Sequence, residues 1–129
     1  METGLELSKI IPFLKKLKVL KISDNIIGDE NSLAIFESLK TNQNIETIEC
    51  DYNDIEEKQT QDKILSNLFD DVGKKKYKKI SLKGNEMNKK VILKYKTKIA
   101  ELVDEFIDVS DEEEEGQKLP FDEKLHGGI

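Results

Sequence analysis

Arginine is absent from this sequence of 129 residues, and all 21 of its basic residues are lysines. That absence excludes an arginine finger and bidentate arginine clamps on phosphate groups. One histidine, His126, and one cysteine, Cys50, are too few for a histidine-based catalytic centre, a cysteine-rich zinc site or a disulfide framework. The seven glycines form neither a dinucleotide-binding nor a phosphate-binding loop pattern. We therefore predict a protein that is not an enzyme and needs no metal and no cofactor.

Long apolar runs are also absent. No stretch approaches the roughly 18–20 apolar residues that a membrane-spanning helix needs. The N-terminal decapeptide carries acids where a secretory signal needs a basic and then an apolar segment. The composition therefore predicts an intracellular, cytoplasmic protein that does not insert into membranes.

Charge is distributed unevenly along the chain. The net formal charge of −6 combines −5 in residues 1–60, +8 in residues 61–100 and −9 in residues 101–129. An acidic block with few apolar residues cannot offset the entropy lost on ordering, so we expect a domain over residues 1–107 and a disordered acidic tail over 108–129. The tail is predicted to keep the protein soluble or to bind a basic partner. Within it, Ser110 precedes several acids, a context typical of a phosphorylation site.

A pattern of apolar residues and asparagine occurs three times. It reads L-x-x-L-x-L-x-x-N, with a further apolar residue two positions after each asparagine and a helical pattern beyond it. A period near 28 residues, with one strand and one full helix in each unit, is typical of ribonuclease-inhibitor-like leucine-rich repeats. The three copies are Leu17–Asn25, Ile45–Asn53 and Tyr77–Asn85.

The predicted fold is α/β, a short right-handed leucine-rich-repeat solenoid of about three repeats. A horseshoe of this kind has a parallel sheet on its concave face and helices outside. Strands are expected near residues 18–23, 46–51 and 78–83. Cys50 occupies an inward slot of the second strand and is predicted to be a buried core residue.

The helices are predicted from apolar residues at helical spacing. A first helix with Leu7, Ile10, Ile11 and Leu14 on its apolar side is expected to be interrupted or redirected near Pro12. The last helix contains Ile92 and is expected to run to about Ile107, with Asn88 as its N-cap.

Asparagine and the polar residues of the strands have separate predicted roles. At each turn, an asparagine can hydrogen-bond neighbouring backbone and tie one coil to the next. These structural asparagines are Asn25, Asn53 and Asn85. Strand alternation places other polar side chains on the concave face, where a protein partner would bind. These candidate binding residues are Lys21, Ser23, Asp24, Glu49, Asp51, Tyr52, Lys79, Ser81 and Lys83.

The densest basic run spans residues 74–79 and contains one aromatic residue, Tyr77, in an apolar slot of the repeat. Nucleic-acid binding favours arginine and interleaved aromatic residues that stack on bases. We therefore interpret the run as solvated lysines and do not expect nucleic acid as a partner.

The last repeat is followed by a polar helix and then at once by the acidic block. Its strand reads Ile80-Ser-Leu-Lys-Gly-Asn85. This order of parts, over residues 5–116, resembles the C-terminal end of the Ran GTPase-activating proteins. The resemblance implies a regulator of nucleocytoplasmic transport that binds the small GTPase Ran. It would accelerate GTP hydrolysis by positioning Ran's own machinery, without an arginine finger, in the cytoplasm or at the nuclear periphery.

Other interpretations stay open. The resembled family has a much longer horseshoe, with its Ran contacts chiefly in earlier repeats, so the chain would be a truncated form and no catalytic-loop asparagine is assigned. The tropomodulin-like actin-capping proteins share the repeat length, and the acidic leucine-rich nuclear phosphoproteins share the tail. The alternative function is a general leucine-rich-repeat module that binds a protein on its concave face.

Overall fold

Short strands alternate with helices along the chain. The computed structural model describes residues 2–24, 27–70 and 75–108. The strands are β1 (Val19–Lys21), β2 (Thr47–Glu49), β3 (Tyr77–Ser81) and β4 (Val103–Ile107). The helices are α1 (Glu2–Ile10), the 3-10 turn η1 (Ile11–Phe13), α2 (Gly28–Leu39), α3 (Lys58–Phe69), α4 (Lys89–Lys94) and α5 (Lys96–Leu102).

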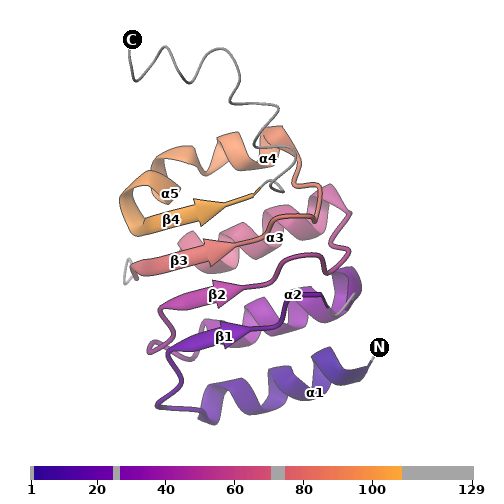
Figure 1. The fold of residues 1–129 in the computed structure, drawn as a ribbon, viewed down its shortest axis with the longest axis vertical. Helices are drawn as coiled ribbons and strands as arrows, with labels where there is room; N and C mark the ends of the chain where they lie inside the picture. The colour runs from indigo at the N-terminus through magenta and orange to yellow at the C-terminus, as the bar shows by residue number, and fades with distance from the viewer. Residues whose placement is uncertain (1, 25–26, 71–74, 109–129) are drawn as a thin grey trace.

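The four strands form one parallel sheet in chain order, β1-β2-β3-β4. Figure 1 shows the strands stacked one above another, with α2 and α3 behind them and α1 at the end nearest β1. The predicted α/β class and parallel sheet are thereby confirmed. The helices cover one side of the sheet, and none of the described helices covers the opposite side.

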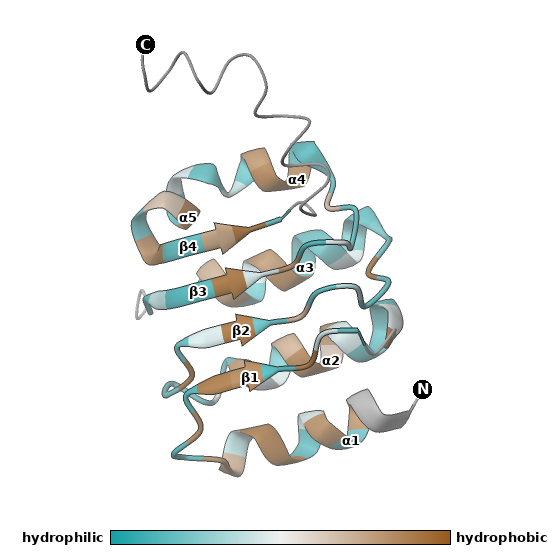
Figure 2. Ribbon diagram, in the orientation of Figure 1, coloured by the Kyte–Doolittle hydropathy of each residue, from teal (hydrophilic) through white to brown (hydrophobic). Residues whose placement is uncertain are grey.

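The core lies between the sheet and the helices. Leu20, Ile48, Ile80 and Phe106 are neighbours across the four strands, and Ile48 and Ile80 are completely buried. Figure 2 shows apolar bands on the strands and on the helices behind them. Cys50 is a buried core residue, as predicted, and burial raises the pKa of its thiol to about 12.

The C-terminal part of the described chain differs from the prediction. The expected single helix is divided at Tyr95 into α4 and α5, and it does not reach Ile107. Residues 103–107 instead form β4, which pairs in parallel with β3. Apolar residues at 99, 102, 103 and 106 suit a helix as well as a strand, so their spacing could not distinguish the two structures. The open edge of β3 offers hydrogen bonds to an extended partner, and the β-branched Val103 and Ile107 favour that conformation.

Two local predictions about helix ends are confirmed. Helix α1 ends at Ile10, and Pro12 lies in the 3-10 turn that follows. Asn88 caps α4, since its side-chain oxygen accepts hydrogen bonds from the backbone N–H groups of Lys90 at 2.8 Å and Val91 at 3.2 Å. Proline has no N–H group with which to continue a helix, so α1 ends before Pro12. An N-cap asparagine accepts hydrogen bonds from the first N–H groups of a helix, so α4 begins after Asn88.

Candidate binding face

The turns after β2 and β3 are joined by buried asparagine side chains. Asn53 donates to the carbonyl oxygen of Ile22 at 2.8 Å, and Asn85 donates to that of Cys50 at 2.9 Å. The oxygen of Asn85 also accepts hydrogen bonds from the backbone of Asn53 at 2.9 Å and of Ile55 at 3.2 Å. Each asparagine therefore connects its own turn to the preceding strand, as expected for a structural role. Asn25 lies outside the described residues.

The residues that precede each turn asparagine share an unusual backbone conformation. Asp24, Tyr52 and Gly84 have positive φ angles of 62°, 53° and 76°. A Cβ placed on Gly84 would lie 2.2 Å from Cδ1 of Tyr52, so the tyrosine ring lies directly against the glycine. Positive φ favours glycine, which has no Cβ. Asp24 and Tyr52 adopt a positive φ despite their Cβ, so Gly84 is needed chiefly for the space that Tyr52 occupies.

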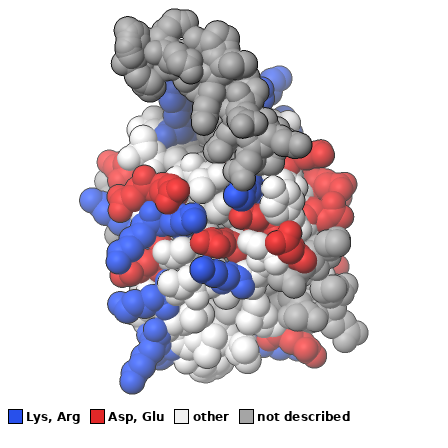
Figure 3. Space-filling view, in the orientation of Figure 1, with Lys and Arg blue, Asp and Glu red and all other residues white. Residues whose placement is uncertain are grey.

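The sheet face turned away from the helices, called the front face below, carries the predicted binding residues of the strands. By register, Lys21, Glu49 and Ser81 are neighbours across β1, β2 and β3. Figure 3 shows lysines and acidic residues interspersed over this face. Lys21, Asp24 and Tyr52 are exposed, while Ser23, Glu49, Lys79 and Lys83 are half-buried.

Two of the nine predicted binding residues are buried instead of available on the surface. Ser81 donates from Oγ to Oδ1 of Asp51 at 2.6 Å, and the same oxygen accepts from the backbone N–H of Lys83 at 3.0 Å. Ser23 Oγ accepts a hydrogen bond from the backbone N–H of Asp51 at 2.9 Å. Strand alternation alone predicts that Asp51 and Ser81 point outward into solvent. Instead, the Asp51 carboxylate bonds to the side chain of Ser81 and to the backbone N–H of Lys83, and both side chains become buried. Asp51 and Ser81 therefore connect strands.

Ion pairs run across the front face between neighbouring strands. Lys79 Nζ lies 3.2 Å from Oε2 of Glu49, and this hydrogen-bonded carboxylate raises the pKa of Lys79, with a further contribution from the charge of Glu105. At the amino ends of the strands, Glu46 lies 3.3 Å from Lys78 and 3.9 Å from Lys18. Pairs this exposed stabilise the fold little. Their charges are therefore free to act in recognition at small cost to folding.

Sequence reasoning missed two of these charged residues, Glu46 at the amino end of β2 and Glu105 beside Lys79 on the front face. A signal for the first was present, because Lys18, Glu46 and Lys78 occupy the same second position of the three repeats. Comparing that position between repeats predicts alternating charges across the sheet. No such signal existed for Glu105, since its strand was interpreted as helix.

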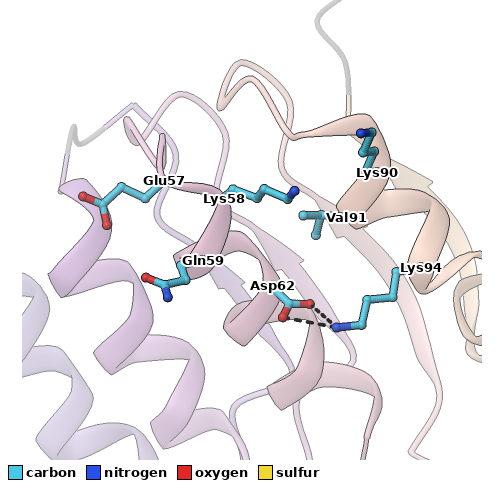
Figure 4. Close-up of a pocket in the computed structure, with 7 residues that line it drawn as sticks. All are labelled: Glu57, Lys58, Gln59, Asp62, Lys90, Val91 and Lys94. Atoms are coloured by element: carbon cyan, nitrogen blue, oxygen red, sulfur yellow. Dashed lines mark hydrogen bonds and ion pairs between the residues drawn. The ribbon is translucent and has the colours of Figure 1, made fainter.

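An open groove of about 770 Å³ lies on the helical side, between α3 and α4. Figure 4 shows its lining, with Lys94 reaching across to Asp62 at 3.0 Å. That hydrogen bond lowers the pKa of Asp62, and burial together with a hydrogen bond to Asp62 raises the pKa of Tyr95 to about 12. The lining residues are Glu57, Lys58, Gln59, Asp62, Lys90, Val91 and Lys94. The Asp62–Lys94 pair in this groove joins α3 to α4.

Within the described ranges, no group of three or more His, Cys, Asp or Glu side chains could hold a metal ion. None of the helices in that part of the chain is long and apolar enough to cross a bilayer.

No protein-family model matches this sequence. The curated proteins likewise include no match.

Proposed function

We propose that residues 1–107 form a leucine-rich-repeat solenoid that binds a protein partner on its concave face, the front face of the sheet. Three features support the repeat assignment. The strands are parallel and follow one another in chain order, a helix follows each of the first three, and buried asparagines join successive turns. Repeated units of this kind stack so that each buries its apolar side against the next.

The observation that carries the binding function is the open front face with its exposed polar rows. Helices cover the other side of the sheet, so only this side presents residues from all four strands together. Tyr52, which is 42% exposed, adds an aromatic ring in the turn after β2, where it lies against Gly84. Aromatic residues are enriched among those that dominate binding energy. The alternating charges would select a partner with the opposite alternation.

The partner that we propose is the small GTPase Ran, and the support is the resemblance in the order of repeat, polar helix and acidic block. A chain without arginine would accelerate GTP hydrolysis only by positioning Ran's own catalytic groups. The acidic segment, residues 108–129, is proposed to assist by attracting a basic surface of the partner. The expected location is the cytoplasm or the nuclear periphery.

The test is binding of purified full-length chain to Ran loaded with GTP or with GDP, at low ionic strength. Selective binding of the GTP form supports a regulator, and single-turnover hydrolysis then separates an activator from a protein that only binds. Equal binding of both forms, or binding of neither, would remove the GTPase assignment. The general protein-binding module is the alternative that would then remain, with the front face as its binding surface.

A further inference from the structure

Within the described residues, the first and last strands of the sheet each have an open edge. The order β1-β2-β3-β4 gives β1 and β4 a neighbour on one side only, at opposite ends of the molecule (Figure 1). An open edge presents peptide N–H and C=O groups that can pair with another chain. What such an edge binds depends on the direction of its peptide groups, its charge and its apolar surface.

The peptide groups of β1 that face outward can be assigned from the hydrogen bonds it makes to β2. The N–H of Ile22 donates to the carbonyl oxygen of Glu49 at 2.8 Å, and the carbonyl of Lys18 accepts from Thr47 at 3.1 Å. Residues 18 and 22 therefore face β2, and alternation directs the peptide groups of Val19 and Lys21 toward the open edge.

The same reasoning applies to β4. The carbonyl oxygen of Ile107 accepts a hydrogen bond from the N–H of Leu82 at 2.7 Å, so residue 107 faces the interior of the sheet. Alternation then directs the peptide groups of Asp104 and Phe106 to the open edge of β4. Both strands run in the same direction, so β4 of one molecule and β1 of another could pair in parallel without reversing either.

The charges at the two edges are opposite in sign. Exposed lysines flank β1, whereas exposed acids lie in and beside β4. The lysines are Lys15, Lys16, Lys18 and Lys21, and the acids are Glu101, Asp104 and Glu105. Edges of equal sign repel each other, which disfavours pairing of β1 with β1 or of β4 with β4.

The sheet itself already shows the alternation that such a joint would continue. At the amino ends of the strands, Lys18, Glu46 and Lys78 form ion pairs across β1, β2 and β3. The register Lys79–Glu105 places Asp104 next to Lys78, so the row ends on an acid. To continue this alternation of positive and negative charge, a strand added beside β4 would need a lysine at the same position. In a second molecule, Lys18 before β1 is that lysine.

Apolar side chains at the two ends add a second contribution. Phe13 in η1 is 77% exposed, and Val19 on β1 is also exposed. At the other end, Leu93 in α4 is 64% exposed. Removing such surfaces from water favours association.

We propose that molecules of this chain associate head to tail, with β4 of one copy pairing in parallel with β1 of the next. The sheet would then continue through the joint, together with its alternation of charge. The two contacting surfaces differ, so the contact does not close on itself and gives linear assemblies. This inference does not depend on the proposed function.

The experiment uses two full-length variants, each with one edge blocked. Val19→Pro removes an outward N–H from β1, and Asp104→Pro removes one from β4. Neither N–H belongs to the ladder within the sheet, and proline is tolerated at such edge positions. Val19→Ala and Asp104→Ala are the matched controls, because alanine keeps the N–H. Molar mass is measured by sedimentation equilibrium at several concentrations, with circular dichroism as the test of folding.

The unmodified chain is expected to rise above its monomer mass of 14.8 kDa with concentration, and to return toward it at high salt. Each proline variant alone should remain monomeric, because one of the two edges that meet in every joint is blocked. Their mixture should form a dimer, since each contributes the edge that the other lacks. The alanine controls should associate more strongly than the proline variants.

An unmodified chain that stays monomeric at every concentration would overturn the proposal. So would a proline variant that dimerises alone, or a mixture of folded variants that stays monomeric. If a proline variant does not fold, Lys21→Glu and Glu105→Lys replace the pair. Each variant reverses one charge where the two edges would meet, so each alone should associate more weakly than the unmodified chain, and their mixture should restore the dimer. Failure of that restoration would contradict the proposed joint.

Discussion

Polar side chains cross the strands in two regions of this molecule, and the regions differ in burial. In the turns, Asn53 and Asn85 are almost completely inaccessible and their side chains bond to backbone of neighbouring strands. On the front face and at the amino ends of the strands, Glu49 with Lys79 and Glu46 with Lys78 form ion pairs that remain partly exposed. An unpaired polar group costs far more when buried than when it can bond to water. Changes in the turns should therefore cost more stability than changes on the front face.

The strongest test of that contrast is Asn85→Ala. The substitution removes the donor to Cys50 and the acceptor for the backbone N–H of Asn53, leaving buried groups without their side-chain partner. We expect a loss of about 3 kcal/mol or more in the free energy of unfolding. Urea denaturation measures it, with the exposed Gln43→Ala as the control, expected to stay within about 0.5 kcal/mol. Equal effects at both positions would contradict the account.

A smaller effect is expected for Gly84→Ala. The new Cβ would collide with Tyr52, and alanine disfavours the φ of 76° by about 1–2 kcal/mol. Combining the change with Tyr52→Ala removes the collision but not the backbone strain. The double variant should therefore lose less stability than the sum of the two single variants, as a denaturation-based double-mutant cycle would show. Simple additivity would mean that the ring does not constrain residue 84.

Acid should weaken the attachment of α3 to the helices that follow it. Lys94 and Lys98 lower the pKa values of Asp62 and Asp70, respectively, through hydrogen bonds. A lowered folded-state pKa gives stability that is present above the unfolded value, about 3.9, and is lost as pH falls through the folded value. The urea midpoint of the Asp62→Asn, Asp70→Asn double variant should consequently fall less steeply in this acid range. An unchanged slope would show that these exposed pairs add nothing.

The smallest change in stability is expected on the front face. Exchanging Glu49 and Lys79 for each other in the double variant Glu49→Lys, Lys79→Glu keeps an ion pair but reverses its direction across the sheet. Because both side chains are partly exposed, the free energy of unfolding should change by about 1 kcal/mol or less. Urea denaturation checks it, and a loss as large as that of Asn85→Ala would remove the distinction between the two regions.

The sequence allowed much of the turn region to be predicted. An asparagine that recurs at the turn position of each repeat is expected to hydrogen-bond the backbone of the turn. The structural role of Asn53 and Asn85 could therefore be predicted from their spacing alone. Burial of Cys50 followed from strand alternation in the same way. These predictions succeeded because each depends on local geometry that the second and third repeats share.

The features of the fold and of the candidate site that the sequence did not predict depend on neighbours that are distant in sequence. Whether residues 103–107 form a helix or a strand is decided by the open edge of β3, which no local spacing reveals. Alternation correctly placed Glu49 and Lys79 on the front face, but it could not show that Asp51 and Ser81 bond to each other and become buried. The binding function itself was not determined by any of these contacts.

The most direct test of the central claim compares the unmodified chain with the Glu49→Lys, Lys79→Glu variant for binding to GTP-loaded Ran, after denaturation has shown both to be equally folded. Our account predicts binding by the unmodified chain and at least about a tenfold loss of affinity, or about 1.4 kcal/mol, in the variant. Equal affinity of the two folded proteins would contradict a binding site on the front face, and absence of binding by both would contradict Ran as the partner.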